Sequence, residues 1–366
     1  MSDTTSPSGR WRLDWPTSRG GRVARARLKS KPEDFRVDED LGLEGFSGES
    51  DLTAISGDGE HLCLRLEKSG DNTEYVAREL AALSGCRSFD VGFCGLKDRH
   101  AVTRQWFSLY RPGLAEEDVA FIDKVAERWP VLSACRHNRK LRRGDHRGNR
   151  FAITLRQIRG DKTGIETALA GLKTQGAPNY FGPQRFGIAG ANLDRAAAMG
   201  PDAMNQGRRS GGRGRKGKGR AGRDASKNVL YFSAARSWLF NEVLALRVEK
   251  GNWFTPLDGE PGLPGNESLV TGPLWGDGGT SAGGVQAELE SGVVDGAPEL
   301  LQLFSTTRMK PERRPLVVRP GELVWDWHND GSLTLEFFLA PGQYATTILS
   351  DIFELEDMSL GQHNNR

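Results

Sequence analysis

The sequence lacks long apolar runs. Apolar residues make up 37% of the 366-residue chain, and its mean hydropathy is −0.53. No stretch approaches the roughly 20 consecutive apolar residues that a membrane-spanning helix needs. Residues 1–22 are polar and contain Pro and Gly, without the apolar core of a secretory signal. We therefore expect a cytoplasmic protein with no membrane association.

Cysteine and histidine are scarce as well. The chain has six scattered histidines and four cysteines, none of them in a C-x-x-C pair: Cys63, Cys86, Cys94 and Cys135. This spacing indicates neither a zinc knuckle nor a disulfide framework, and we interpret the cysteines as small buried apolar residues. A phosphate-cradling glycine motif is also missing. The sequence thus predicts no metal site and no small-molecule cofactor.

The positive charge of the chain is concentrated in one segment. The net charge is only +2, yet residues 205–227 contain nine Lys and Arg against the single Asp224, which gives this segment +8 and the rest about −6. Such a segment cannot bury enough apolar surface to offset its chain entropy, so we expect a flexible basic loop. It can bind phosphates, or it can be a solvated insertion without specific function.

Hydrophobic periodicity predicts a mixture of strands and helices. We expect strands near residues 35–39, 61–68, 91–93, 105–110 and 333–339, where apolar residues alternate with polar ones. Helices are predicted from Asp71 to Gly85, over 233–251 and over 346–355. Residues 252–294 are rich in Gly and Pro and predict turns and short strands. A length of 366 residues suggests two domains, and the lack of regular strand–helix alternation favours an α+β fold.

Asp98 is the most informative polar residue, because it lies in a charged loop, GLKDRHAVT, between two predicted strands. The neighbouring cations Lys97 and Arg99 would favour its ionised form, and a carboxylate can act as a nucleophile. The local pattern equally suits a solvated turn in which Asp98 pairs with these neighbours. Spacing alone leaves the two interpretations open.

Seven blocks of the sequence resemble, in order, those of the TruD family of pseudouridine synthases. They are GLKDRHAVTRQW and the blocks at residues 31–39, 57–77, 136–151, 178–187, 233–241 and 339–347. The resemblance implies an α+β pseudouridine synthase core with a mixed or antiparallel sheet. It also implies that residues 1–178 and 326–366 form a split catalytic domain, interrupted by a family-specific α+β domain over 179–325 that carries the basic loop.

The same resemblance assigns roles to individual residues. Asp98 is expected to be the nucleophile, and Lys29 a cation close to it. The remaining positions match residues that contact the target nucleotide: Phe35, Asn149, Phe151 and Tyr344. Tyr344 departs from the usual Phe, which keeps the stacking face and adds a hydroxyl group. Without the resemblance, the two Phe residues would be interpreted as core aromatics and Asn149 as a turn former.

Two further regions carry candidate RNA contacts. Residues 136–143 contain five Lys or Arg and lie beside Asn149, which favours phosphate contacts. In the block at 178–187, we expect the aromatic residues to be structural and Arg185 to contact RNA. The implied reaction is isomerisation of uridine to pseudouridine in tRNA, at position 13 of the D arm, by a monomer that needs no cofactor because no electrons are transferred.

Two alternatives belong to other functional classes. A non-catalytic RNA-binding protein could keep the fold and the basic surfaces, although the intact Asp98 loop argues against a loss of turnover. A metal-dependent RNA hydrolase would need several converging acidic ligands. The blocks offer Glu33, Asp34, Glu39 and Asp98, but their spacing does not suggest a metal pair.

Overall fold

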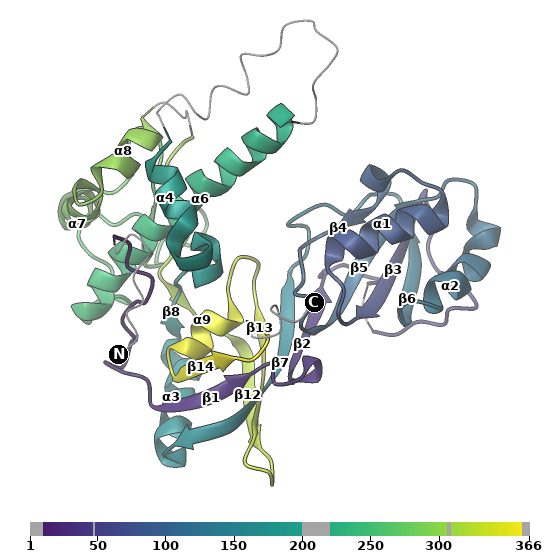
Figure 1. Cartoon of the computed structure of the whole chain (residues 1–366), viewed down its shortest axis with the longest axis horizontal. Helices are drawn as coiled ribbons and strands as arrows, with labels where there is room; N and C mark the ends of the chain where they lie inside the picture. The colour runs from purple at the N-terminus through teal and green to yellow at the C-terminus, as the bar shows by residue number, and fades with distance from the viewer. Residues whose placement is uncertain (1–9, 47, 200–219, 306–308, 361–366) are drawn as a thin grey trace, which may run out of the picture. The chain divides into compact units, whose positions relative to one another are not determined.

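The computed structural model describes residues 10–46, 48–199, 220–305 and 309–360, with only the backbone for residues 220–227. The chain divides into two compact units, each built from separate stretches of sequence (Figure 1). The sheet unit comprises Val23–Lys173, Pro320–Ala345 and Phe353–Arg366. The helical unit comprises Met1–Arg22, Thr174–Arg319 and Thr346–Ile352.

The sheet unit is organised by one mixed sheet with the strand order β12-β13-β7-β2-β5-β3-β6. These strands are β12 (Gly321–Trp327), β13 (Leu333–Leu339), β7 (Gly148–Gly160), β2 (Phe35–Asp40), β5 (Val102–Tyr110), β3 (His61–Lys68) and β6 (Val131–His137). At the C-terminal end of β7, β1 (Ala24–Leu28) pairs antiparallel with β7 and parallel with β14 (Phe353–Asp357). The short β4 (Gly92–Phe93) pairs with β5. The combination of helices with a mixed sheet confirms the α+β prediction.

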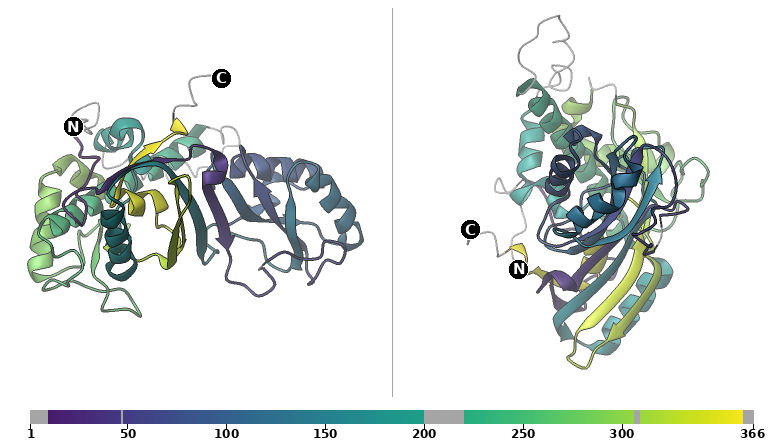
Figure 2. Two further views of the ribbon diagram at one scale, coloured as in Figure 1. Left: turned by 90° about the horizontal axis from the view of Figure 1, so that it is seen from below. Right: turned by 90° about the vertical axis from the view of Figure 1, so that its right-hand side faces the viewer.

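Two helices cover one face of the β3–β5–β6 part of this sheet (Figure 2). Leu62, Leu64 and Leu66 alternate along β3 and pack against α1 (Thr73–Ser84) and α2 (Asp118–Ala126). The α1 helix begins after Asn72, whose side chain accepts a hydrogen bond from the Tyr75 amide, and ends at Gly85 with φ +71°. The sequence therefore predicted this helix and its end, although the cap is Asn72 instead of Asp71.

The β12–β13 end of the sheet is tied to α3 (Lys162–Gln175). The indole nitrogens of Trp325 and Trp327 donate to the two carboxylate oxygens of Glu166, at 2.9 and 2.6 Å. The Glu166 carboxylate thereby satisfies the indole N–H groups of two tryptophans of β12, and these two hydrogen bonds hold α3 against the strand.

The helical unit is built around α6 (Arg220–Glu249), which contains the predicted helix over 233–251. Its other elements are α4 (Ala191–Ala197), α7 (Gly284–Asp295), α8 (Pro298–Phe304), most of α9 (Ala345–Ser350), and the strand pairs β9 (Thr271–Leu274) with β10 (Glu312–Pro315) and β8 (Ala177–Pro178) with β11 (Val317–Val318). Within the described residues, the two units also contain the 3-10 turns η1 (Pro32–Asp34), η2 (Ser88–Asp90), η3 (Ala115–Glu117), η4 (Pro183–Phe186) and η5 (Ile188–Gly190).

Aromatic residues of the block at 178–187 belong to the core of the helical unit, as predicted. Tyr180, Phe181 and Phe186 are buried. Arg185 donates to the hydroxyl groups of Ser233 and Ser237 on α6, at 2.6 and 3.3 Å, and its guanidinium lies 5.5 Å from the Phe181 ring centroid. These contacts give Arg185 a structural role; its predicted RNA contact stays a prediction.

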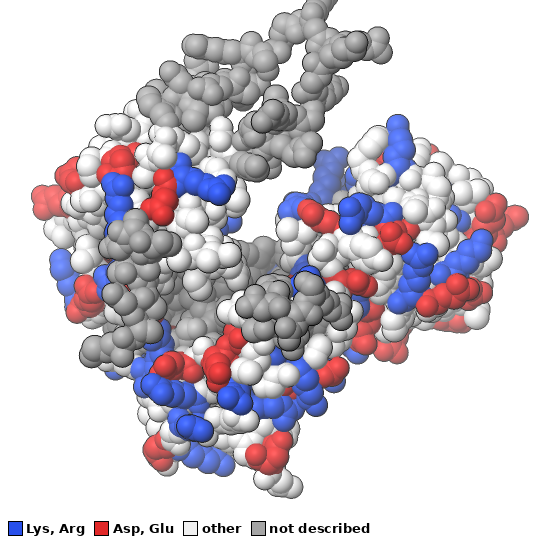
Figure 3. Space-filling view, viewed as in Figure 1, with Lys and Arg blue, Asp and Glu red and all other residues white. Residues whose placement is uncertain are grey.

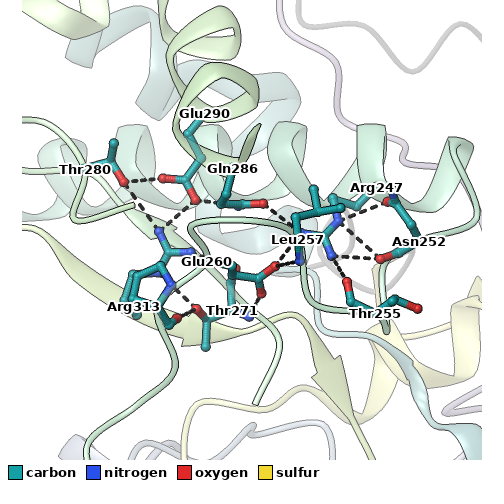
Figure 4. Close-up of polar contacts among 11 residues, drawn as sticks. Arg247, Asn252, Thr255, Leu257, Glu260, Thr271, Thr280, Gln286, Glu290 and Arg313 are labelled. Carbon is teal, nitrogen blue, oxygen red and sulfur yellow. Dashed lines mark hydrogen bonds and ion pairs between the residues drawn. The ribbon is translucent and has the colours of Figure 1, made fainter. Parts of the chain in front are cut away.

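A buried ionic network also holds the helical unit together (Figure 4). The fully buried Arg247 donates to Glu260 and Gln286, at 2.9 and 2.8 Å, and to the backbone carbonyls of Asn252 and Thr255. Nearby, Arg313 pairs with the buried Glu290 at 2.7 Å. Charges buried this deeply need partners, so the network fixes the Gly- and Pro-rich segment after α6 onto α7 and β9.

The structure corrects three local predictions. Residues 284–295 form α7 instead of turns and strands; Gln286, Glu290 and Val294 are buried at four-residue spacing, and the glycines obscured this helical pattern. The predicted helix over 346–355 ends at Ser350, and Phe353–Asp357 is strand β14, because pairing with β1 outweighs its helical pattern. Residues 220–227 of the predicted basic loop are helical backbone in α6, and residues 205–219 lie outside the described residues.

Within the described ranges, no helix has the length and the apolar character needed to cross a membrane.

Candidate active site

The loop that carries Asp98 is clamped on both sides of Leu96. The side-chain amide of Gln105 donates to the Gly95 carbonyl at 2.6 Å, and the Lys97 backbone amide donates to the Thr73 hydroxyl at 2.9 Å. That hydroxyl in turn donates to the carbonyl oxygen of the Gln105 side chain at 2.9 Å. Because Thr73 opens α1 and Gln105 lies in β5, a helix and a strand jointly hold the loop in place.

Asp98 is held as a carboxylate by two donors. Lys29 Nζ lies 2.5 Å from one carboxylate oxygen, and the His100 backbone amide donates to the other at 2.9 Å. Burial opposes ionisation, but the hydrogen bond from Lys29, the His100 amide and the charge of Lys29 outweigh it and hold the pKa of Asp98 below its ordinary value. About a third of the Asp98 side chain remains exposed, so a substrate atom can reach it.

Lys29 supplies this cation from a left-handed backbone conformation. Its φ angle is +55°, at the turn that follows β1, and its side chain is almost fully buried. The ammonium group also lies 3.6 Å from Asp357 and 4.8 Å from the centroid of the Phe35 ring. Lys29 and Asp98 are 69 residues apart in sequence, and the structure brings them together as the resemblance implies.

Lys97, which precedes Asp98 in the sequence, pairs with a different carboxylate. Its ammonium group pairs with Glu39 at 2.6 Å, and both side chains are buried. The second carboxylate oxygen of Glu39 accepts the Trp106 backbone amide at 3.1 Å. The alternative interpretation, in which Asp98 pairs with its neighbour Lys97 in a solvated turn, is therefore wrong for Lys97, which instead fastens the loop to β2 and β5.

A row of aromatic rings extends from Lys29 across the sheet. The Phe35 and Phe151 ring centroids are 6.1 Å apart in an edge-to-face arrangement, and Phe151 stacks on Phe337 at 5.5 Å. Strand register puts Val37 opposite Phe151 and Phe151 opposite Phe337, so these side chains share one face. Sequence reasoning missed Phe337, although its alternation within β13 could have indicated it.

Asn149 lies on the same face, two residues before Phe151, and is paired in register with Glu39 and Leu339. Its side-chain oxygen is buried and has no hydrogen-bond partner among the residues that the structure describes. A buried acceptor without a partner is costly, so this oxygen is available to a ligand. Tyr344 follows β13 and is half-buried; its contact with the target nucleotide stays a prediction.

Lys68 is a further buried cation that sequence reasoning did not single out. It is almost fully buried on β3, and its ammonium group donates to the Asp71 carbonyl at 2.9 Å. Burial, together with the nearby charge of Lys97, lowers the pKa of Lys68 to about 8, against the opposing charges of Asp71 and Asp98. The residue type alone did not indicate that Lys68 is buried, because its burial depends on the packing of α1 onto the sheet.

The basic segment at 136–143 divides into structural and exposed residues. Arg136 is buried and pairs with Asp118 at 2.7 Å, which corrects its assignment as a phosphate contact. Arg139 and Arg142 are exposed, as is Arg143, which also pairs with Glu74 at 3.3 Å. Elsewhere on the visible surface, Lys and Arg are mixed with Asp and Glu (Figure 3).

Three of the four acidic residues considered for a metal-dependent alternative are paired with cations. Asp34 accepts from the Arg156 guanidinium at 2.8 to 2.9 Å, and Glu39 pairs with Lys97 as described. Asp98 pairs with Lys29. These carboxylates therefore give the hydrolase alternative no support.

Comparisons with known proteins agree on one family. The family tRNA pseudouridine synthase D (TruD) matches residues 20–194 and 262–352. The tRNA pseudouridine synthase D of Marinobacter nauticus is 61% identical, with 98% of this chain and 99% of that protein covered. The corresponding protein of Methylococcus capsulatus is 36% identical, with 94% and 95% covered.

A solved structure extends the similarity to the fold. The putative tRNA pseudouridine synthase D from Methanosarcina mazei superposes with a TM-score of 0.62, at 20% identity, and covers 93% of this chain and 94% of that one. At this identity, the structural likeness shows only that the fold is shared. The family is shown by the sequence matches, which extend over most of the chain. The chain belongs to the TruD family of tRNA pseudouridine synthases, which are isomerases of uridine.

Proposed function

We propose that this enzyme isomerises the uridine at position 13 in the D arm of tRNA, with Asp98 as nucleophile on a flipped-out nucleotide. The observation that carries the proposal is the Asp98 carboxylate, held ionised by Lys29 at 2.5 Å and accessible at the end of a row of aromatic rings. Position 13 comes from the resemblance to the family.

The reaction breaks the bond between N1 of uracil and C1′ of ribose and forms a bond between C5 and C1′. Asp98 attacks either C1′ or C6, and the covalent adduct allows the base to turn within the site. A base then removes the C5 proton, which leaves for solvent, and N1 ends up protonated. Electrons are neither gained nor lost, so the chemistry requires no redox cofactor.

Each neighbouring residue has a proposed part in this sequence. Lys29 keeps Asp98 ionised until it attacks, and Phe35 and Phe151 offer ring faces to the extruded base, worth on the order of 1–3 kcal/mol. Asn149 presents its buried, unpartnered oxygen to an N–H group of uracil. Tyr344 is proposed as an additional contact to the target nucleotide.

The larger assignments are also proposals. Residues 1–178 and 326–366 would form the split catalytic domain and residues 179–325 the family-specific domain, with the basic segment at 205–227 extending the tRNA-binding surface. We propose a cytoplasmic monomer that needs neither a metal nor a small-molecule cofactor.

The test uses an unmodified tRNA transcript tritiated at C5 of uracil, in the presence of a chelator. We expect the parent enzyme to release tritium and to place pseudouridine at position 13, while Asp98→Asn binds tRNA and releases none. Release by Asp98→Asn would remove Asp98 as nucleophile. Tight binding by the parent without release would favour the non-catalytic RNA-binding alternative, and activity that the chelator abolishes would favour the metal-dependent one.

A further inference from the structure

Leu96 is a large apolar side chain exposed beside the nucleophile. Leu96 is 56% exposed, whereas the next residue, Lys97, is 9% exposed. Asp98, the residue after that, is again open to solvent, with 36% of its side chain exposed. Leu96 and Asp98 are therefore both open to solvent on the same loop, with the buried Lys97 between them.

The backbone around Leu96 is also held more firmly than an ordinary exposed loop. The carbonyl before it accepts from Gln105 at 2.6 Å, and the amide after it donates to Thr73 at 2.9 Å. The Lys97 side chain is anchored to Glu39 at 2.6 Å. Leu96 is therefore an apolar group presented from a rigid support, and no ordering of the loop opposes its insertion into a substrate.

An exposed apolar side chain is useful to an enzyme that flips a uridine out of an RNA stack. Moving a base out of an RNA stack costs a few kcal/mol and leaves a gap between its two neighbours. Apolar side chains that enter a base stack offset this cost, because they cover the ring faces that the departing base exposed. The group has to come from beside the catalytic atom, since the gap lies next to the nucleotide that is being removed.

We propose that Leu96 is the wedge that fills the stack vacated by the target uridine. The proposal rests on the proposed function, in which Asp98 acts on a flipped-out uridine. Leu96 enters the gap from the loop that carries Asp98, so the base leaves the stack toward the carboxylate as the leucine takes its place.

The adjoining basic segment supports this geometry. The Gly144 amide donates to the Cys94 carbonyl at 2.9 Å, which joins this segment to the start of the Asp98 loop. Arg142 and Arg143, immediately before Gly144, are exposed. Guanidinium groups at this position can hold the phosphates that flank the distorted step while the base rotates outward.

The test compares Leu96→Ala, Leu96→Met and a matched control, Val324→Ala. Val324 lies on β12 of the same unit and is 53% exposed, so it loses a similar exposed apolar group away from the Asp98 loop. The readouts are single-turnover tritium release at saturating enzyme and the fluorescence of 2-aminopurine placed next to the target uridine in the tRNA transcript.

We expect Leu96→Ala to lower the single-turnover rate on the order of tenfold and to reduce the fluorescence rise on binding, because unstacking is less favourable. Leu96→Met and Val324→Ala should stay within about twofold of the parent, since methionine keeps the apolar volume. In a tRNA with an abasic site beside the target, where less stacking is lost, the Leu96→Ala deficit should shrink to about twofold or less.

An unchanged rate and fluorescence rise in Leu96→Ala would overturn the proposal, as would an equal loss on the intact and the abasic tRNA, which would indicate general damage to the loop. The Asp98→Asn variant separates this proposal from the function on which it rests. It should release no tritium yet keep the fluorescence rise; tritium release by Asp98→Asn would refute the nucleophile without touching the wedge.

Discussion

At the scale of single residues, the candidate site depends on which carboxylate each buried lysine pairs with. Lys29 and Lys97 are both buried near Asp98, yet one pairs with Asp98 and the other with Glu39. The first pair governs the ionisation of Asp98, the proposed nucleophile. The second pair governs the position of the loop, because it ties the residue before Asp98 to β2 and, through the Trp106 amide, to β5.

Replacing Lys29 by methionine should shift the pH dependence of catalysis. The pKa of Asp98 lies below its ordinary value, and the hydrogen bond and charge of Lys29 outweigh the burial that raises it. Without this cation the pKa of Asp98 rises, so the carboxylate becomes protonated at higher pH. The acidic limb of kcat/KM should move upward in Lys29→Met and should stay near the parent's position in Lys29→Arg. An unmoved limb in Lys29→Met would show that Lys29 does not set this ionisation.

Breaking the Lys97–Glu39 pair should be costly for stability. Lys97→Met leaves Glu39 buried and charged without its partner, and such a loss amounts to about 3–5 kcal/mol of unfolding free energy. Combining Lys97→Met with Glu39→Leu removes both charges, so the double variant should be more stable than Lys97→Met alone. Urea unfolding monitored by circular dichroism measures these differences; additive losses would contradict the coupling.

At the scale of elements, strand register determines which side chains share the aromatic face. β7 contributes Asn149 and Phe151, and its antiparallel pairing with β2 and β13 sets Glu39 and Phe337 beside them. A shift of one residue would turn all of these side chains to the opposite face. Close contact between the strands at Gly148, where β7 begins, helps to hold that register.

A methyl group at Gly148 should disturb the face. A Cβ atom there would overlap the Phe338 ring and the Leu339 carbonyl oxygen. We expect Gly148→Ala to cost about 1–3 kcal/mol of stability and to lower kcat, because Asn149 and Phe151 move with the strand.

Gly164, in α3, provides the matched control. A Cβ atom at this position would only make an ordinary contact, 3.5 Å from a carboxylate oxygen of Asp161. Gly164→Ala should leave kcat unchanged and stabilise the protein by about 0.4–1 kcal/mol. Equal behaviour of the two variants in thermal unfolding and single-turnover assays would refute the role of close strand approach at Gly148.

At the scale of the whole molecule, the two units are held together by different interactions. The contacts described for Asp98 come from the sheet unit, whereas the helical unit is held together by its own aromatic core and by the Arg247 and Arg313 network. A tRNA is much larger than the surface around Asp98, so further contacts outside the catalytic site have to supply binding energy. The concentrated charge of residues 205–227 is the strongest candidate in the sequence.

Neutralising that charge should weaken tRNA binding without slowing the chemistry. Residues 208–218 contain six Lys and Arg, and replacing these with serine keeps the segment length and stops short of α6 at Arg220. We expect lower affinity at moderate salt and a shallower slope of log affinity against log salt, since fewer counterions are released. The single-turnover rate at saturating enzyme should not change. Unaltered affinity and slope would remove the basic segment from the binding surface.

The sequence by itself determined the features that depend on neighbours a few residues apart. The alternation of Leu62, Leu64 and Leu66, the glycine that ends α1 and the ordered family blocks all predicted their structures or their family correctly. Segments whose pattern suits more than one structure are predicted incorrectly. The glycines of α7 obscure its helical periodicity. The helix predicted over 346–355 extends into β14, which pairs with β1 as a strand.

Apart from the family resemblance, which implied that Lys29 lies near Asp98, only the tertiary structure decided which charges meet. The pairing of Lys29 with Asp98 joins residues 69 positions apart, and the burial of Lys97 against Glu39 depends on how the loop crosses β2 and β5. Phe337 likewise reaches Phe151 only through strand pairing. Local patterns report the conformation of the backbone because they arise from its periodicity, whereas ion pairs and ring contacts depend on which distant segments the topology brings side by side.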